Sequence, residues 1–160
     1  MNFDDIEKIA TVLDAMIQNE LLMSDFYKHC AELWTEDQVL WNNLTLAEIS
    51  HADNICKIKD IIVKRPESFS IFRPFNLVAI NTVMAGLKDN VRRLTAGDIS
   101  REKALIIARD IERSILESNY GEIVKTDDIE YNTLLKDILS QTQEHKNMIQ
   151  KKIMEIEAKA

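Results

Sequence analysis

The chain has 160 residues, of which 46% are hydrophobic and 29% charged, so we expect one globular domain spanning residues 1–160. The 20 basic and 27 acidic side chains give a net charge of −7 without a basic stripe, which argues against nucleic acid or an anionic membrane as a partner. There is no signal-peptide pattern, no apolar run of membrane-spanning length and no CxxC pair, since Cys30 and Cys56 stand apart, so we expect a cytoplasmic protein with reduced thiols.

Long helices are the predicted elements, because only three glycines and two prolines interrupt the chain. The first helix is predicted over about residues 4–34, where apolar side chains recur at alternating steps of three and four. A capping box at residues 35–38 predicts the start of a second helix, which ends before Pro66. Since the joint between them is short, these two helices should pack antiparallel.

Three further helices are predicted in the second half of the chain. One covers about residues 76–95 with Asn76 as its N-cap, one covers about residues 100–120, and the last starts at Asp127 or Asp128. Two hairpins joined by a connection that contains a crossing helix indicate an all-α fold. The expected architecture is an antiparallel four-helix bundle with a long crossover containing an additional helix.

Five polar residues lie in the apolar seams of these helices: Glu20, Glu48, His51, Glu112 and His145. A carboxylate in such a place must pair, bind a cation or take up a proton, and no Lys or Arg occupies the middle of a seam. Glu48 and His51 are three residues apart, so both can reach one ion, and Glu48 can bridge two. Three carboxylates and two imidazoles at similar heights predict a site for two divalent ions, preferably iron or manganese.

Each of these residues, taken singly, can also be explained without a metal ion. A single glutamate in a seam usually lies at the edge of the apolar stripe with its head in water. A single core histidine is more often a hydrogen-bonded structural residue than a ligand, and for His145 taken alone that interpretation is preferred. The metal prediction depends on the five residues acting together.

The combination resembles the ferritin-like superfamily and, within it, the rubrerythrin-like branch. The resemblance rests on Glu20 followed seven residues later by Tyr27, on the Glu-x-x-His motif of Glu48 and His51, and on Glu112, and it covers nearly the whole chain. It implies a ferritin-like bundle whose carboxylate-bridged di-iron centre oxidises ferrous iron or reduces peroxide or oxygen. Iron is then the expected cofactor, with manganese or zinc as alternatives.

The resemblance also implies partners and a role for one tyrosine. It implies a homodimer. It also implies an external electron donor such as a rubredoxin, because this sequence has no Cys₄ iron site of its own. Tyr27 would lie close to the metal pair, where it would hydrogen-bond a ligand carboxylate or act as a redox neighbour. The alternative is a buried tyrosine whose hydroxyl is satisfied without any such role.

The sequence departs from the family pattern in the last helix, where a second Glu-x-x-His motif is expected. Thr142 stands in place of the glutamate three residues before His145, and Glu144 is rotated by about 100° from its neighbour. We therefore distinguish a first group, which looks complete, from a second group that lacks one carboxylate. The first group is Glu20, Glu48 and His51, and the second group is Glu48, Glu112 and His145.

Two functions follow from this asymmetry. One is a metal-binding oxidoreductase of the ferritin-like kind, with the metal as the reactive group. The other is a non-catalytic helical bundle that serves as a binding or scaffold protein and has a degraded or single-metal site. Thr142 is the feature that favours the second interpretation.

Overall fold

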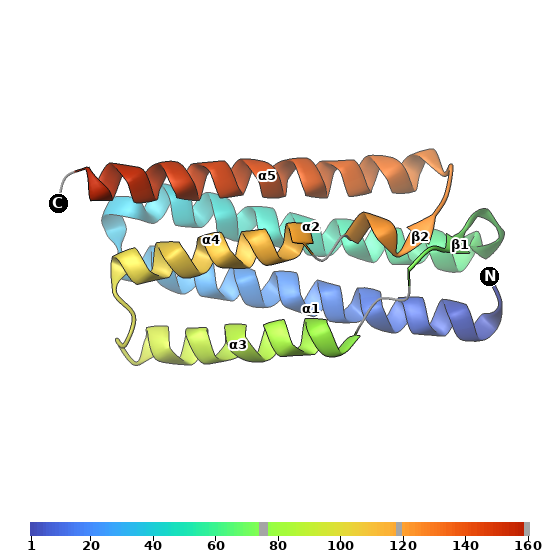
Figure 1. Cartoon of the computed structure of the whole chain (residues 1–160), viewed down its shortest axis with the longest axis horizontal. Coiled ribbons are helices and arrows are strands. Elements are labelled where there is room, and N and C mark those ends of the chain that lie inside the picture. Colours follow the sequence, from blue (N-terminus) through green and yellow to red (C-terminus); the bar gives the residue numbers. More distant parts are fainter. Residues whose placement is uncertain (74–76, 118–119, 159–160) are drawn as a thin grey trace.

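The computed structural model describes residues 1–73, 77–117 and 120–158, and helices dominate this part of the chain (Figure 1). Its α-helices are α1 (Phe3–Leu33), α2 (Gln38–Lys64), α3 (Leu77–Thr95), α4 (Arg101–Glu117) and α5 (Ile129–Glu157). Short 3₁₀ turns are η1 (Thr35–Asp37), η2 (Pro66–Ser68) and η3 (Tyr120–Glu122). The all-α prediction is confirmed. Among the described helices, none combines the length with the apolar composition that a membrane-spanning segment needs.

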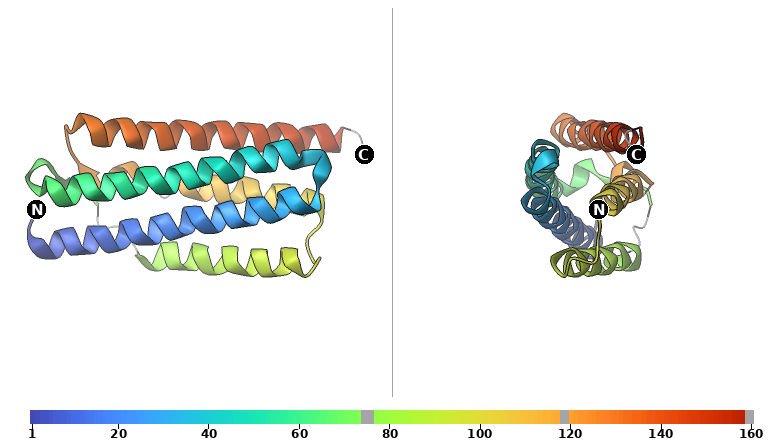
Figure 2. Two further views of the ribbon diagram at one scale, coloured as in Figure 1. Left: turned by 180° about the vertical axis from the view of Figure 1, so that it is seen from behind. Right: turned by 90° about the vertical axis from the view of Figure 1, so that its left-hand side faces the viewer.

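The helices lie side by side with their axes roughly aligned along the length of the molecule (Figures 1 and 2). α1 and α2 form one antiparallel pair, α4 and α5 form another, and α2 also packs against α5. α3 packs along α1 and runs in the same direction, so it carries the chain back to the end where α4 begins. Buried apolar side chains from all five helices join in one core.

Side chains at the helix starts explain where α1 and α5 begin. Asn2 accepts a hydrogen bond from the backbone N–H of Asp5, whose carboxylate accepts one from the N–H of Asn2, so α1 starts at Phe3. Asp128 accepts a hydrogen bond from the N–H of Tyr131, which confirms it as the N-cap of the last helix. The predicted cap Asn76 lies outside the described residues.

The predicted capping box at residues 35–38 is wrong. Residues Thr35–Asp37 form the 3₁₀ turn η1, and α2 begins at Gln38 without a side-chain cap. Asp37 is instead buried and binds two cations from distant parts of the chain. Its carboxylate accepts from Arg101 at 2.6 and 2.9 Å and lies 2.7 Å from Nζ of Lys152. These contacts connect the turn to the start of α4 and to α5.

A two-stranded ladder joins the two long linkers at the other end of the molecule (Figure 1). β1 (Ser70–Ile71) pairs antiparallel with β2 (Val124–Lys125), with Ser70 opposite Lys125. A strand of two residues is too short to show the alternation of apolar and polar side chains that identifies strands, so neither strand was predicted from the sequence. α4 is described to Glu117, residues 118–119 lie outside the described residues, and Tyr120, near which the fourth helix was predicted to end, lies in η3.

Candidate metal centre

All five seam residues predicted to bind metal are buried in the structure, and none is more than 7% exposed. α1 supplies Glu20, α2 supplies Glu48 and His51, α4 supplies Glu112, and α5 supplies His145. The structure brings them together as the two groups defined above. Within each group the potential ligand atoms all lie within 4.8 Å of one another. Their action as metal ligands stays a prediction.

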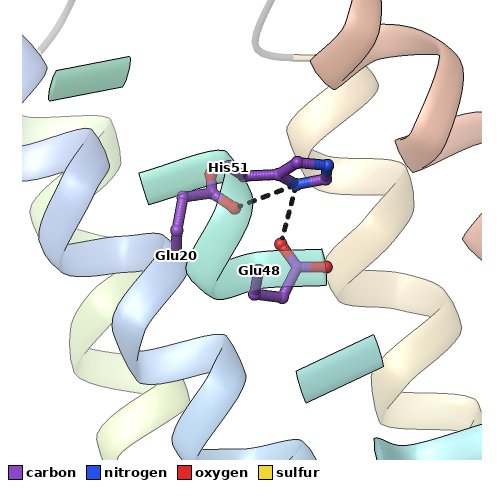
Figure 3. Close-up of side chains that lie close together, drawn as sticks. All are labelled: Glu20, Glu48 and His51. Carbon is purple, nitrogen blue, oxygen red and sulfur yellow. Dashed lines mark hydrogen bonds and ion pairs between the residues drawn. The ribbon is translucent and has the colours of Figure 1, made fainter. Parts of the chain in front are cut away.

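The first group is arranged around one imidazole nitrogen (Figure 3). Nδ1 of His51 lies 3.0 Å from Oε2 of Glu48 and 3.7 Å from Oε2 of Glu20. Glu48 and His51 face the same way because they are one helical turn apart on α2, and Glu20 reaches them from the neighbouring α1. A cation among these three residues would meet two carboxylates and one imidazole.

The second group uses the other oxygen of Glu48. Oε1 of Glu48 lies 3.3 Å from Nδ1 of His145, which is also 3.9 Å from Oε1 of Glu112. Glu48 therefore directs one oxygen into each group, as a bridging carboxylate must. The hydroxyl of Tyr27 donates a 2.8 Å hydrogen bond to Oε1 of Glu112, so this tyrosine does contact a candidate ligand.

Several buried polar atoms of the second group lack a hydrogen-bond partner among the described residues. They are Oε1 of Glu48, Oε2 of Glu112 and Nδ1 of His145. Burying such atoms without partners is costly, because each loses its bonds to water. A divalent cation would satisfy all three at once, and carboxylate and imidazole donors suit iron or manganese. The residues present thus fit the metal that the sequence implies.

Burial makes two of the three carboxylates unusually basic. Burial raises the pKa of Glu20 to about 8, with the charge of Glu48 adding to the effect and His51 opposing it. Burial, followed by the charge of Glu48, also raises the pKa of Glu112 well above its ordinary value. Without a cation, Glu20 therefore tends to hold a proton near neutral pH, and the pKa of Glu112 is shifted in the same direction.

Glu48 and His51 behave in the opposite way. Burial alone would raise the pKa of Glu48, but the neighbouring His145 and His51 lower it to about 2. Burial alone would lower the pKa of His51, but Glu20 and Glu48 raise it to about 10. At neutral pH the first group therefore contains an anionic Glu48 and a cationic His51, whose proton occupies the place of a metal ion.

Tyr27 is enclosed by aromatic rings. Its ring stacks on Trp41 at a centroid distance of 5.9 Å and an interplanar angle of 27°, and Phe26 meets it edge-on. Burial, followed by the charge of Glu112, raises the pKa of Tyr27 well above its ordinary value. The hydroxyl of Tyr27 has a hydrogen-bond partner, as expected of a buried tyrosine without a role in metal binding. That partner, Glu112, is however also a candidate metal ligand.

Thr142 stands where the resemblance leads us to expect a glutamate, and it supplies no carboxylate to the second group. Thr142 is buried at 1% exposure, and its hydroxyl donates to the carbonyl of Ile138 at 2.9 Å within its own helix. Glu144 is exposed and does not replace the absent group. α5 therefore contributes only His145 to the two groups.

Sequence reasoning missed one polar contact of the first group. Oε1 of Gln141 lies 3.2 Å from Nε2 of His51, on the side of the ring away from the carboxylates. Gln141 is half-buried beside the seam position Thr142, and glutamines at such edges are usually solvated. The periodic pattern gave no signal for it.

Comparisons with protein-family models, curated proteins and solved structures give no match to this chain. The ferritin-like resemblance therefore stays an expectation from the sequence.

Proposed function

We propose that this chain is a ferritin-like metalloprotein that holds two divalent metal ions, iron or manganese, in the first and second groups. The observation that carries the proposal is the position of Glu48. Its two oxygens are directed into different groups, each of which adds one further carboxylate and one imidazole. A buried carboxylate shared in this way is typical of bridged metal pairs in helical bundles.

The roles of the residues follow from this assignment. Glu20 and His51 would hold one ion, Glu112 and His145 the other, and Glu48 would bridge them. Tyr27 would fix the orientation of Glu112 through its hydrogen bond, leaving Oε2 of Glu112 for the ion. When bound, the metal pair would supply redox chemistry in which oxygen or peroxide accepts electrons, either from a separate carrier or from ferrous iron.

A second candidate function is supported by Thr142. Because its hydroxyl is bonded within α5, it leaves the second group one carboxylate short. The alternative is therefore a non-catalytic bundle that binds one ion in the first group, or none, and serves as a scaffold. The first group does not depend on this position, so it should retain an ion even when the second group does not.

Metal analysis of protein purified in air without chelator distinguishes these functions. We expect about two iron or manganese ions per chain, and a change in the absorption spectrum when peroxide is added. One ion without a spectral change would leave metal binding intact and remove the redox function. Absence of metal, together with a His51→Ala variant as stable as the natural chain, would refute the proposal.

Matched glutamate variants test the role of Glu48. Glu48→Gln keeps the shape of the side chain but weakens both groups, so we expect it to bind neither ion. Glu144→Gln is the control, because Glu144 is exposed on α5 next to His145. It should bind as much metal as the natural chain.

The partners and the location belong to the same proposal. We expect a cytoplasmic homodimer with a separate electron carrier such as a rubredoxin. The outer face of α2 exposes four apolar side chains that a second copy would cover: Val39, Leu46, Ile49 and Val63. Both cysteines are free thiols, as the proposed location requires.

A further inference from the structure

Gln141 touches the first group without belonging to it. Its Oε1 lies 3.2 Å from Nε2 of His51. The other ring nitrogen, Nδ1, faces Glu48 and Glu20 (Figure 3). The two nitrogens therefore have different partners on different sides of the ring. One side meets candidate ligands, and the other meets a neutral amide oxygen from α5.

The amide oxygen acts on the Nε2 proton of His51, which stays on the ring when a cation takes the place of the proton on Nδ1. An amide oxygen accepts hydrogen bonds and cannot donate them, so it favours the form of the ring with a proton on Nε2. In that neutral form the lone pair lies on Nδ1, the nitrogen that faces the two glutamates. The ring is also restrained by His145, which stacks on it at 5.5 Å between centroids.

We propose that Gln141 is a positioning residue for the first group. It holds His51 in the Nε2–H form and directs Nδ1 toward the cation that Glu20 and Glu48 would bind. The inference rests on the proposed function. It also assigns α5 a part in a group whose ligands come only from α1 and α2.

The neutral character of Gln141 has a chemical consequence. Histidine ligands commonly donate their second N–H to a carboxylate, a backbone carbonyl or a water, and a carboxylate makes the ring a stronger ligand. Gln141 orients the ring without adding a fourth negative charge to three buried carboxylates. A glutamate at this position should therefore still orient the ring, and should strengthen metal binding where its charge is tolerated.

Three variants test the proposal. Gln141→Leu removes the acceptor at similar volume, and Gln141→Glu retains one. Gln143→Leu is the control, because it makes the same change two residues along α5 at an exposed side chain whose described bond is to Asn147. Mn²⁺ affinity is measured by calorimetry at fixed pH. The Nε2 proton of His51 is followed by ¹H–¹⁵N NMR in the metal-free and Zn²⁺-loaded proteins, and the unfolding temperatures are compared.

We expect Gln141→Leu to weaken Mn²⁺ binding about tenfold or more, the usual effect of losing such a partner. It should also lose the slowly exchanging Nε2 proton while its unfolding temperature stays close to that of the control. Gln141→Glu should keep the proton and bind at least as tightly as the natural chain, and Gln143→Leu should change neither property.

Two results would overturn the inference while leaving the proposed function intact. They are unchanged Mn²⁺ affinity in Gln141→Leu, and a natural chain that binds Mn²⁺ without a protected Nε2 proton. A natural chain that shows the protected proton but binds neither Mn²⁺ nor Zn²⁺ would refute the proposed function itself, and the positioning role with it.

Discussion

At the scale of single residues, the centre is an array of groups that cannot all be charged at once. Three carboxylates are buried together, and His51 supplies a compensating positive charge beside two of them. The pKa values of Glu20 and Glu112 are raised, which favours their neutral, protonated forms and so reduces the repulsion among the carboxylates. In the metal-free protein, protons therefore occupy the positions that cations would take.

Metal affinity should consequently rise with pH. Below pH 8 the metal-free protein holds protons on Glu20, whose pKa is about 8, and on His51, whose pKa is about 10. An ion must displace them, so each displaced proton makes binding about tenfold tighter per pH unit. Calorimetric titration with Mn²⁺ between pH 6 and 8, in buffers of different ionisation enthalpy, counts the protons released.

The variant Glu20→Gln provides the control for this count. It removes one titrating group, so it should release about one proton fewer than the natural chain when it binds Mn²⁺. An affinity that does not change between pH 6 and 8 would show that the buried groups are already deprotonated before the metal binds.

At the scale of helices and turns, Asp37 connects elements that are distant in sequence. It lies in η1, while its partners Arg101 and Lys152 lie at the start of α4 and near the end of α5. Burial alone would raise the pKa of Asp37, but these two cations lower it below its ordinary value of 3.8. The contact therefore holds both hairpins together at one end of the molecule.

We expect Asp37→Asn to lower the free energy of unfolding by about 1–3 kcal/mol at pH 7, measured by urea titration, because it weakens charged hydrogen bonds. A larger loss is not expected, since Arg101 and Lys152 are each about one-quarter exposed. Because folding lowers the pKa of Asp37, its contribution is present above the ordinary carboxyl pKa and is lost as the pH falls below 3.8. The difference between variant and natural chain should therefore shrink in acid.

Glu36→Gln is the matched control for that measurement. Glu36 is exposed and lies 3.6 Å from the same arginine, so its loss should cost less than about 1 kcal/mol. Equal losses in the two variants would contradict a special role for Asp37.

Helix positions were predictable where local signals determine them. The first two helices were predicted from the period of their apolar side chains. The start of the last helix was predicted from Asp128, which caps the N–H of a residue only three positions away. The capping box at residues 35–38 does not form, and Asp37 within it binds side chains more than 60 residues away, which no local pattern contains. Gln141 was missed for a similar reason, since its partner His51 is 90 residues distant and only helix packing brings them together.

At the scale of the whole molecule, the two groups draw their side chains from α1, α2, α4 and α5. The seam pattern was enough to predict which residues meet, because long helices with a fixed period place residues of similar height side by side. Ions bound there would connect both hairpins near their middles, between the α1–α2 turn at one end and the β1–β2 ladder at the other (Figure 1).

Metal loading should therefore stabilise the fold. At a free Mn²⁺ concentration of 100 times the dissociation constant, one ion adds about 2.7 kcal/mol if the unfolded chain does not bind it. For a chain of this size that corresponds to a rise in unfolding temperature of roughly 5–10 °C. Scanning calorimetry with Mn²⁺ and with chelator measures the difference.

The variants Glu48→Gln and Glu144→Gln test whether this stabilisation comes from the centre. Glu48→Gln should abolish the stabilisation by Mn²⁺, whereas Glu144→Gln should preserve it. A rise of equal size in both variants would indicate that the ions bind on the surface.

The β1–β2 ladder has a consequence for how the molecule opens. Long helices ordinarily fray from their ends, and fraying would admit water to buried carboxylates. Here Asp37 binds Arg101 and Lys152 at one end, and strands from the two linkers pair at the other. Small molecules that reach the centre should therefore pass between helices, through brief sideways separations in which the ends stay fixed.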